Sequence, residues 1–281
     1  KPDFTADVVK HNLDLLHKPL LKCVKDPAEK CRELSITILG ALVPLATAAD
    51  VAAIAGETLV GIRERIGVLP QAEESEEVRL ELVRLVKAVL EVLPSSAHDH
   101  IDHLASILEK SCYDKFPDVK KLACELIVCI SKQQEAVHLK DYCPTLIKAL
   151  LLNLSHQQQK IRVSALQAIG AIVPINPTIL KETLPSVAKL NLDRTHQLRE
   201  QVLHVISDWL GALDKSEAPN ILPILLHGAA DELDQVQETS VALMEEVGQS
   251  RPPLEGDDVV PALGHAPLAL YPRAFKGRPC R

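Results

Sequence analysis

The feature that most constrains this chain is an internal repeat of about forty residues. Six segments share one register, and each opens on a polar residue: Asp26, Glu73, Asp114, His156, Asp193 and Asp231. Successive openers lie 47, 41, 42, 37 and 38 residues apart, which is the length of a repeat made of two helices. Such a unit cannot bury its apolar face alone, so the pattern predicts helical hairpins that stack on one another.

Two apolar columns follow the openers at fixed distances. The fifth residue after each opener is apolar: Cys31, Val78, Val119, Ile161, Leu198 and Val236. The ninth is small or apolar: Ser35, Leu82, Ala123, Ala165, Val202 and Ser240. Because residues four apart lie on one face of a helix, we expect both columns to enter the stack.

A basic column stands directly after the first apolar one. It is basic in five of the six segments, with Gln237 as the exception: Arg32, Arg79, Lys120, Arg162 and Arg199. We expect each opener to cap the turn between two helices, where free N–H groups favour an acceptor. The basic side chain can reach an acidic opener, its own or a neighbour's, and such a ladder would fix the angle between repeats.

Two residues of this column pattern carry specific expectations. Arg199 is predicted to lie beside Asp193, where it would stabilise the contact between the fourth and fifth repeats. His156 replaces the carboxylate of the other openers. An imidazole there would most simply cap the turn, and the alternative is a pH-sensitive contact opposite Arg162.

The register of a carboxylate, an apolar residue and a basic residue resembles the HEAT-repeat family. Four segments are similar to the amino-terminal repeats of HEAT-repeat factors that assemble axonemal dynein: DPAEKCR at 26–32, SHQQQKIRVSALQAIGAI at 155–172, SDWLGALDK at 207–215 and DQVQETSVALMEEVG at 234–248. YPRAFKGRP at 271–279 is similar to the proline-rich break after those repeats. The resemblance implies a cytoplasmic factor for the pre-assembly of dynein arms in ciliated cells. Its implied partners are dynein arm subunits and chaperone-type assembly factors.

The predicted fold is an all-α, right-handed α-solenoid of about six HEAT-type helical hairpins spanning residues 1–248. The expected repeats cover about 1–47, 50–93, 97–133, 136–174, 177–213 and 217–248. Pro19, Pro185 and Pro223 each fall within the first helix of a pair, where a proline bends the helix. Residues 249–281 contain six prolines and three glycines without a helical stripe, so we expect an irregular connector there.

Composition narrows the class of function. Aromatic residues make up only 2% of the chain, so the core must be built from aliphatic side chains, as in helix-on-helix packing. The net charge is −7 without a basic stripe, which argues against nucleic-acid binding, and charges interrupt every apolar run, which argues against a membrane span. The seven cysteines include no C-x-x-C pair and most sit on apolar stripes, such as Cys124 and Cys129. They are interpreted as buried, reduced thiols of a cytosolic protein.

No sequence motif indicates catalysis. The chain has no Gly-rich phosphate loop, no G-x-S-x-G, no H-E-x-x-H and no kinase signature. We therefore expect a non-enzymatic scaffold that needs no cofactor and binds no small-molecule substrate. Two other classes stay open: a transport receptor or trafficking adaptor, and a regulatory scaffold subunit of a phosphatase or kinase. The sequence does not identify the residues that contact a partner protein.

Three segments offer candidate sites, each with a simpler interpretation. In HDHIDH at 98–103, His98 with Asp102, or Asp99 with His103, could share a metal ion, but a solvated helix start is favoured. The acidic run at 73–77 could dock a basic partner, but it also fits a solvated helix start. Trp209, the single tryptophan, is more simply a buried filler between repeats than an exposed binding hot spot. No residue is predicted to be catalytic, cofactor-binding or metal-binding.

Overall fold

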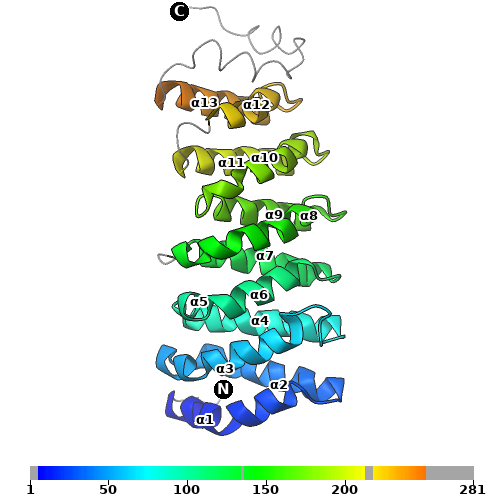
Figure 1. Cartoon of the computed structure of the whole chain (residues 1–281), viewed down its shortest axis with the longest axis vertical. Helices are drawn as coiled ribbons and strands as arrows, with labels where there is room; N and C mark the ends of the chain where they lie inside the picture. The colour runs from blue at the N-terminus through cyan, green and yellow to red at the C-terminus, as the bar shows by residue number, and fades with distance from the viewer. Residues whose placement is uncertain (1–5, 134–135, 213–217, 251–281) are drawn as a thin grey trace, which may run out of the picture. The chain divides into compact units, whose positions relative to one another are not determined.

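The computed structural model describes residues 6–133, 136–212 and 218–250. Over these residues the secondary structure is helical and contains no strand, which confirms the all-α prediction (Figure 1). The chain divides into two compact units, residues 1–150 and 151–281, and each is described by itself.

The first unit is a two-layer array of paired helices. Its elements are α1 (Ala6–Cys23), α2 (Glu29–Leu42), η1 (Val43–Leu45), α3 (Ala48–Ile66), α4 (Glu76–Val92), α5 (Ser96–Asp99), α6 (Ile101–Cys112), α7 (Pro117–Ser131), η2 (Ala136–Tyr142) and the start of α8 (Cys143–Asn153). The first helices α1, α3 and α6 contact one another in sequence, and so do the second helices α2, α4 and α7. Each first helix also packs on the second helix of its own pair (Figure 1).

The second unit repeats this arrangement. It contains α9 (Gln159–Ile172), η3 (Pro177–Ile179), α10 (Leu180–Lys189), η4 (Leu190–Leu192), α11 (His196–Ala212), α12 (Ala218–Gly228) and α13 (Asp234–Ser250). The helices α9, α11 and α13 form the second-helix layer, while α10 and α12 contact each other in the first-helix layer.

Local sequence explains where several helices begin. Thr47 and Asp50 form a reciprocal capping box at the start of α3. The side chain of Ser75 accepts a hydrogen bond from the Val78 amide at the start of α4. Pro117 occupies the first position of α7, where its missing N–H costs nothing.

The core is aliphatic and follows the predicted columns. All six residues of the ninth-position column are at most 2% exposed, as expected. Five residues of the fifth-position column are buried, but Cys31 is exposed, contrary to the prediction. Pro19, Pro185 and Pro223 lie inside α1, α10 and α12.

Trp209 marks a close approach between α9 and α11. Its indole is fully buried, and its N–H donates to the carbonyl oxygen of Gly170 at 3.1 Å. The interpretation as a buried filler is therefore confirmed, and the hot-spot alternative is wrong. A Cβ atom on Gly170 would lie 2.8 Å from Cγ2 of Val205, so only glycine lets the two helices come this close.

Changing Gly170 to Ala should lower the free energy of unfolding by about 1–2 kcal/mol. The new methyl group overpacks against Val205, and this cost exceeds the helix-propensity gain of up to about 1 kcal/mol. Urea denaturation measures the change. In a Val205→Ala background the obstacle is gone, so the same substitution should become neutral or stabilising.

Gly40 in α2 provides the matched control. A Cβ atom there would meet nothing within 4 Å, so Gly40→Ala should stabilise the chain by about 0.5–1 kcal/mol through propensity alone. Equal effects of the two substitutions would contradict the packing argument.

A buried imidazole joins α1 to α3. His17 is 4% exposed, and its Nε2 lies 3.0 Å from Oγ1 of Thr58, which itself donates to the Ile54 carbonyl. Nε2 must therefore carry the proton. Burial lowers the pKa of His17 despite the Glu57 carboxylate 3.9 Å from Nδ1, and the neighbouring Lys18 acts in the same direction as burial.

His17 should make the chain less stable in mild acid. A pKa lowered from 6.5 means that neutral His17 contributes stability above pH 6.5, and this contribution is lost as the pH falls through the folded-state pKa. His17→Gln keeps a donor for Thr58 without titrating. Urea midpoints measured from about pH 8 to about pH 5 should therefore fall less in this variant. His11→Gln, at an exposed position of the same helix, should behave like the unaltered chain.

Candidate functional site at the inter-repeat turns

All six openers cap the turn between their two helices. The side chain of each accepts a hydrogen bond from the backbone N–H two residues later, at 2.7–3.1 Å. In five repeats the acceptor is a carboxylate oxygen, and in the fourth it is Nδ1 of His156. This Nδ1 contact confirms the expected role of His156 as a simple cap, and Arg162 contacts the backbone carbonyl of His156 at 2.9 Å.

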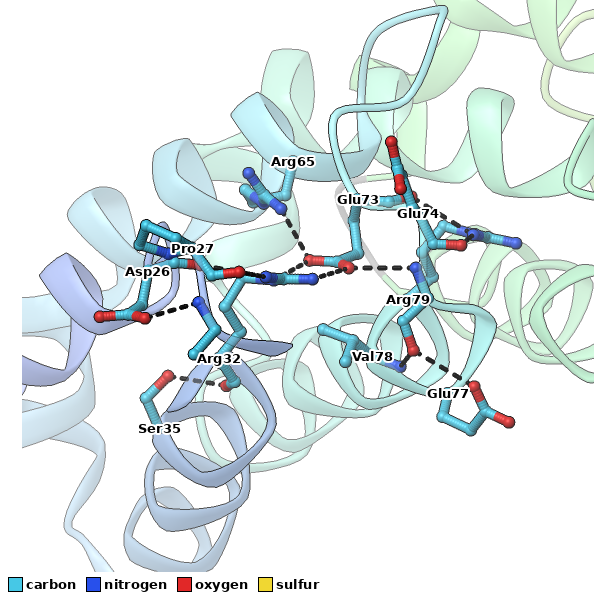
Figure 2. Close-up of polar contacts among 12 residues, drawn as sticks. Asp26, Pro27, Arg32, Ser35, Arg65, Glu73, Glu74, Glu77, Val78 and Arg79 are labelled. Carbon is cyan, nitrogen blue, oxygen red and sulfur yellow. Dashed lines mark hydrogen bonds and ion pairs between the residues drawn. The ribbon is translucent and has the colours of Figure 1, made fainter. Parts of the chain in front are cut away.

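The guanidinium of Arg32 joins the first turn to the second. Its Nε and Nη2 donate to the two carboxylate oxygens of Glu73 at 2.7 and 2.8 Å. Its Nη1 donates to the carbonyl oxygens of Asp26 and Pro27 in its own turn at 3.0 and 3.1 Å. Figure 2 shows Glu73 between Arg32 and a second guanidinium, that of Arg65, which donates at 2.7 Å.

Three more arginines bind the carboxylate of the next turn, and we call the four together the arginine ladder. Arg79 pairs with Asp114, Arg162 with Asp193, and Arg199 with Asp231, at 2.7–3.0 Å. Each also donates through Nη1 to one or two carbonyls of its own turn. Each arginine therefore donates to backbone carbonyls of its own turn and to the carboxylate side chain of the next turn.

The prediction that Arg199 pairs with Asp193 is wrong. Its carboxylate partner is Asp231, and it touches Asp193 only at the backbone carbonyl, at 2.8 Å. The pair thus stabilises the contact between the fifth and sixth repeats. Asp193 is instead occupied by Arg162 of the preceding repeat.

Two repeats carry a different residue in the basic column. Lys120 donates to the carbonyl of Cys112 at 2.9 Å, at the end of the preceding helix. Gln237 donates through Nε2 to the carbonyl of Asp231, so it keeps the contact with its own turn. An amide or an ammonium thus replaces part of what the guanidinium does elsewhere.

The ladder holds its carboxylates ionised. Burial would raise the pKa of Glu73, but hydrogen bonds from Arg32, Arg65 and the Ser75 amide outweigh it and leave the pKa below 4.5. The pKa values of Asp193 and Asp231 are lowered in the same way. Glu73 is 1% exposed, so the acidic run at 73–77 is not a fully solvated helix start: its first residue belongs to the ladder.

The HDHIDH run does not form the helical pairs that were the alternative to a solvated helix start. The helix breaks at His100, between α5 and α6, so residues four apart do not share one face. His98 contacts Asp99 and the ring of His138, whereas Asp102 accepts from Tyr142 and His103 contacts Arg63. In the described segments, no three His, Cys, Asp or Glu side chains converge as a metal site would need.

The cysteines are only partly buried. Cys112, Cys124 and Cys143 are buried, whereas Cys23, Cys31 and Cys129 are exposed, so the expectation for Cys129 is wrong. None of these six thiols forms a disulfide, and Cys280 lies outside the described residues. Burial raises the pKa of the Cys143 thiol to about 12, which makes it a poor nucleophile.

Changing Glu73 to Gln should cost about 3 kcal/mol of unfolding free energy near neutral pH, because the buried Arg32 and the half-buried Arg65 both lose their carboxylate. The lowered pKa means that the contribution of Glu73 is complete above pH 4.5 and is lost as the pH falls through the folded-state value. The gap between the variant and the unaltered chain should therefore close below that pH.

Glu77→Gln removes the same charge from an exposed position of the same turn. Its unfolding free energy, from urea denaturation, should stay within about 0.5 kcal/mol of the unaltered chain. Equal losses in the two variants would mean that net charge, and not the ladder, sets the stability.

Comparison with known structures supports the repeat fold. A designed armadillo repeat protein in complex with the peptide (KR)4 superposes with a TM-score of 0.61 at 18% identity, covering 82% of this chain and 98% of the other. An armadillo repeat protein computationally designed for modular peptide recognition gives 0.61 at 16% identity, covering 81% and 98%. These likenesses show an α-solenoid fold. No described helix is long and apolar enough to span a bilayer.

Sequence comparison assigns the family. Dynein axonemal assembly factor 5 of Xenopus laevis is 31% identical over 278 residues, covering 97% of this chain and 32% of the relative. The Homo sapiens protein of that name is 30% identical over 260 residues, covering 90% and 30%. The chain thus spans about a third of the length of these relatives. The family model for the helical repeats of dynein axonemal assembly factor 5-like proteins, described as TPR repeats, matches residues 1–251, so the chain belongs to this family.

Proposed function

We propose that this chain is a non-enzymatic, protein-binding part of a cytoplasmic factor that helps to assemble axonemal dynein arms. The observation that carries the proposal is the arginine ladder in a chain of this family. The ladder holds neighbouring second helices in a fixed register. The solvent-exposed sides of these helices are then available to bind other proteins. The proposed partners are dynein arm subunits and chaperone-type assembly factors.

The outer side of the second-helix layer is suited to binding extended segments. Gln159 and Gln197 form an amide contact at 2.7 Å between α9 and α11, and Gln167 and Gln201 approach to 3.5 Å. Amides offer both donors and acceptors to a peptide backbone. Several weak contacts along one segment add up to useful avidity, and none needs a nucleotide or a metal.

Incomplete multi-subunit complexes expose apolar surface and aggregate. A repeat protein that engages several of their segments at once would protect such intermediates. The relatives carry the name of an assembly factor for axonemal dynein, and a designed neighbour of similar fold has a peptide bound. Both facts support a role in holding proteins during assembly.

A transport receptor or adaptor for basic cargo is the second candidate. Its support is the charge of α11 and α13, whose exposed or half-exposed ionisable side chains are mostly acidic: Glu200, Asp208, Asp234, Glu238, Glu245 and Glu246. Against it, the second helices of the first unit mix both signs, as Glu81 and Arg84 on α4 show. A scaffold subunit of a phosphatase or kinase has no observation of its own in its favour.

Depletion of the full-length protein from multiciliated cells tests the proposal. Cilia should form at normal length but carry fewer outer and inner dynein arms, and their beating should be impaired. Arm subunits should be unstable in the cytoplasm, which immunoblotting can follow. Normal arms and normal motility after complete depletion would refute the role in dynein assembly.

Rescue with altered full-length protein tests the binding face. Gln167→Arg with Gln201→Arg adds two positive charges to the second-helix layer and should fail to restore the arms. Glu182→Arg makes the same change in net charge at an exposed position of α10, in the first-helix layer, and this variant should restore the arms. Both proteins must reach normal levels in the cell. Full rescue by the double variant would show that the partners bind a different face of the protein.

A further inference from the structure

A cavity of about 520 Å³ opens at the inter-repeat turns of the first unit. The loop between α3 and α4 forms one wall through Leu69, Pro70 and Gln71. The end of α6 and the turn after it form the other wall, with Tyr113 and Lys115. Its volume is within the range of pockets that take a small ligand or one large side chain.

The arginine ladder lines this cavity without supplying free charge. Glu73, Arg79 and Asp114 all border it, but each is buried in the ion pairs described above. Lys110 also borders it and lies 2.8 Å from the carboxylate of Glu109. The Arg79–Asp114 and Lys110–Glu109 pairs are each neutral, and Glu73 is shared by Arg32 and Arg65, so none of these carboxylates is left without a cation.

Two carboxylates of the cavity are left over. Glu74 and Glu76 are exposed at the start of α4, and no hydrogen bond or ion pair engages either side chain within the described segments. Lys115 is the single exposed cation among the lining residues. The unpaired charge on the rim is therefore negative and favours a cationic ligand.

The walls carry two further signs of a binding site. Tyr113 is 36% exposed and Leu69 58% exposed, so an aromatic and an aliphatic side chain stand open to solvent on opposite sides. The amide nitrogen of Gln71 is buried and has no hydrogen-bond partner in the described part of the chain. A buried donor without an acceptor is costly, and a small rotation of this amide would let a bound carbonyl satisfy it.

We propose that this cavity binds an arginine side chain from an extended segment of a partner protein. The planar guanidinium stacks on the ring of Tyr113, and its charge is held by Glu74 and Glu76. Leu69 and Pro70 cover the aliphatic stem, and Gln71 donates to the backbone of the segment. An acidic or phosphorylated side chain would instead meet two unpaired carboxylates. The inference deepens the proposed function, since it names the chemistry of one partner contact.

Selective labelling gives a direct test on the intact chain. The chain has three tyrosines, so ring-labelled protein yields few signals, and Tyr113→Phe identifies the signal of Tyr113. The probe is a capped pentapeptide of glycine and serine with a central arginine, titrated at physiological salt. The Tyr113 signal should shift and saturate while the Tyr142 signal stays. A peptide with a central glutamate should leave the Tyr113 signal in place.

Matched charge variants decide whether the cavity is responsible. Glu74→Gln with Glu76→Gln should weaken binding of the arginine peptide about tenfold or more. Glu245→Gln with Glu246→Gln removes the same charge from exposed positions of α13 and should leave the affinity unchanged. Equal weakening by both pairs, or no saturable shift of Tyr113, would overturn the proposal. Either result leaves the dynein-arm experiment unaffected, so the two inferences fail separately.

Discussion

One interaction sets the geometry of each unit: the guanidinium of a second-helix arginine binds two turns at once. Its Nη1 holds the carbonyls of its own turn, and the fork of Nε and Nη2 holds the carboxylate of the next turn. That carboxylate in turn accepts a hydrogen bond from the Ser75 N–H in the turn before α4. The conformation of a turn and the distance to its neighbour are therefore fixed by the same atoms. An ammonium group lacks this planar fork, and Lys120 accordingly engages a carbonyl of the preceding helix.

The ladder and the apolar columns have different roles. Buried ion pairs recover little net free energy beyond the cost of their dehydration, so most of the stability must come from the aliphatic core. The ladder instead disfavours other packings of neighbouring repeats. If one repeat slid along its neighbour, Glu73 or Asp114 would be buried without its cation. Stacked aliphatic helices alone would tolerate several crossing angles. A column of paired charges selects one of them.

The periodic sequence predicts the helices and columns well but leaves the direction of the ladder open. Every repeat offers nearly the same residues, so spacing alone cannot tell whether Arg199 reaches Asp193 or Asp231. The same pattern cannot show that Cys31 is exposed while its counterparts in the other repeats are buried. The sequence does not indicate the helix break at His100, because HDHIDH contains no proline or glycine. The sequence also does not indicate the contact of Arg65 or the cavity, because both involve loops and helix ends that share no register.

This division between a periodic framework and irregular loops bears on how the chain could evolve different partners. Glu73, Arg79 and Asp114 form part of the cavity wall and cannot change without breaking a rung. Residues such as Gln71, Glu74 and Tyr113 lie outside the repeat columns, and their side chains hold no rung together. Substitutions among them would alter the charge and shape of the cavity while the stacking of the helices stays the same. In such a protein the ladder keeps the framework of the cavity constant, and the loops around the cavity determine which ligand it binds.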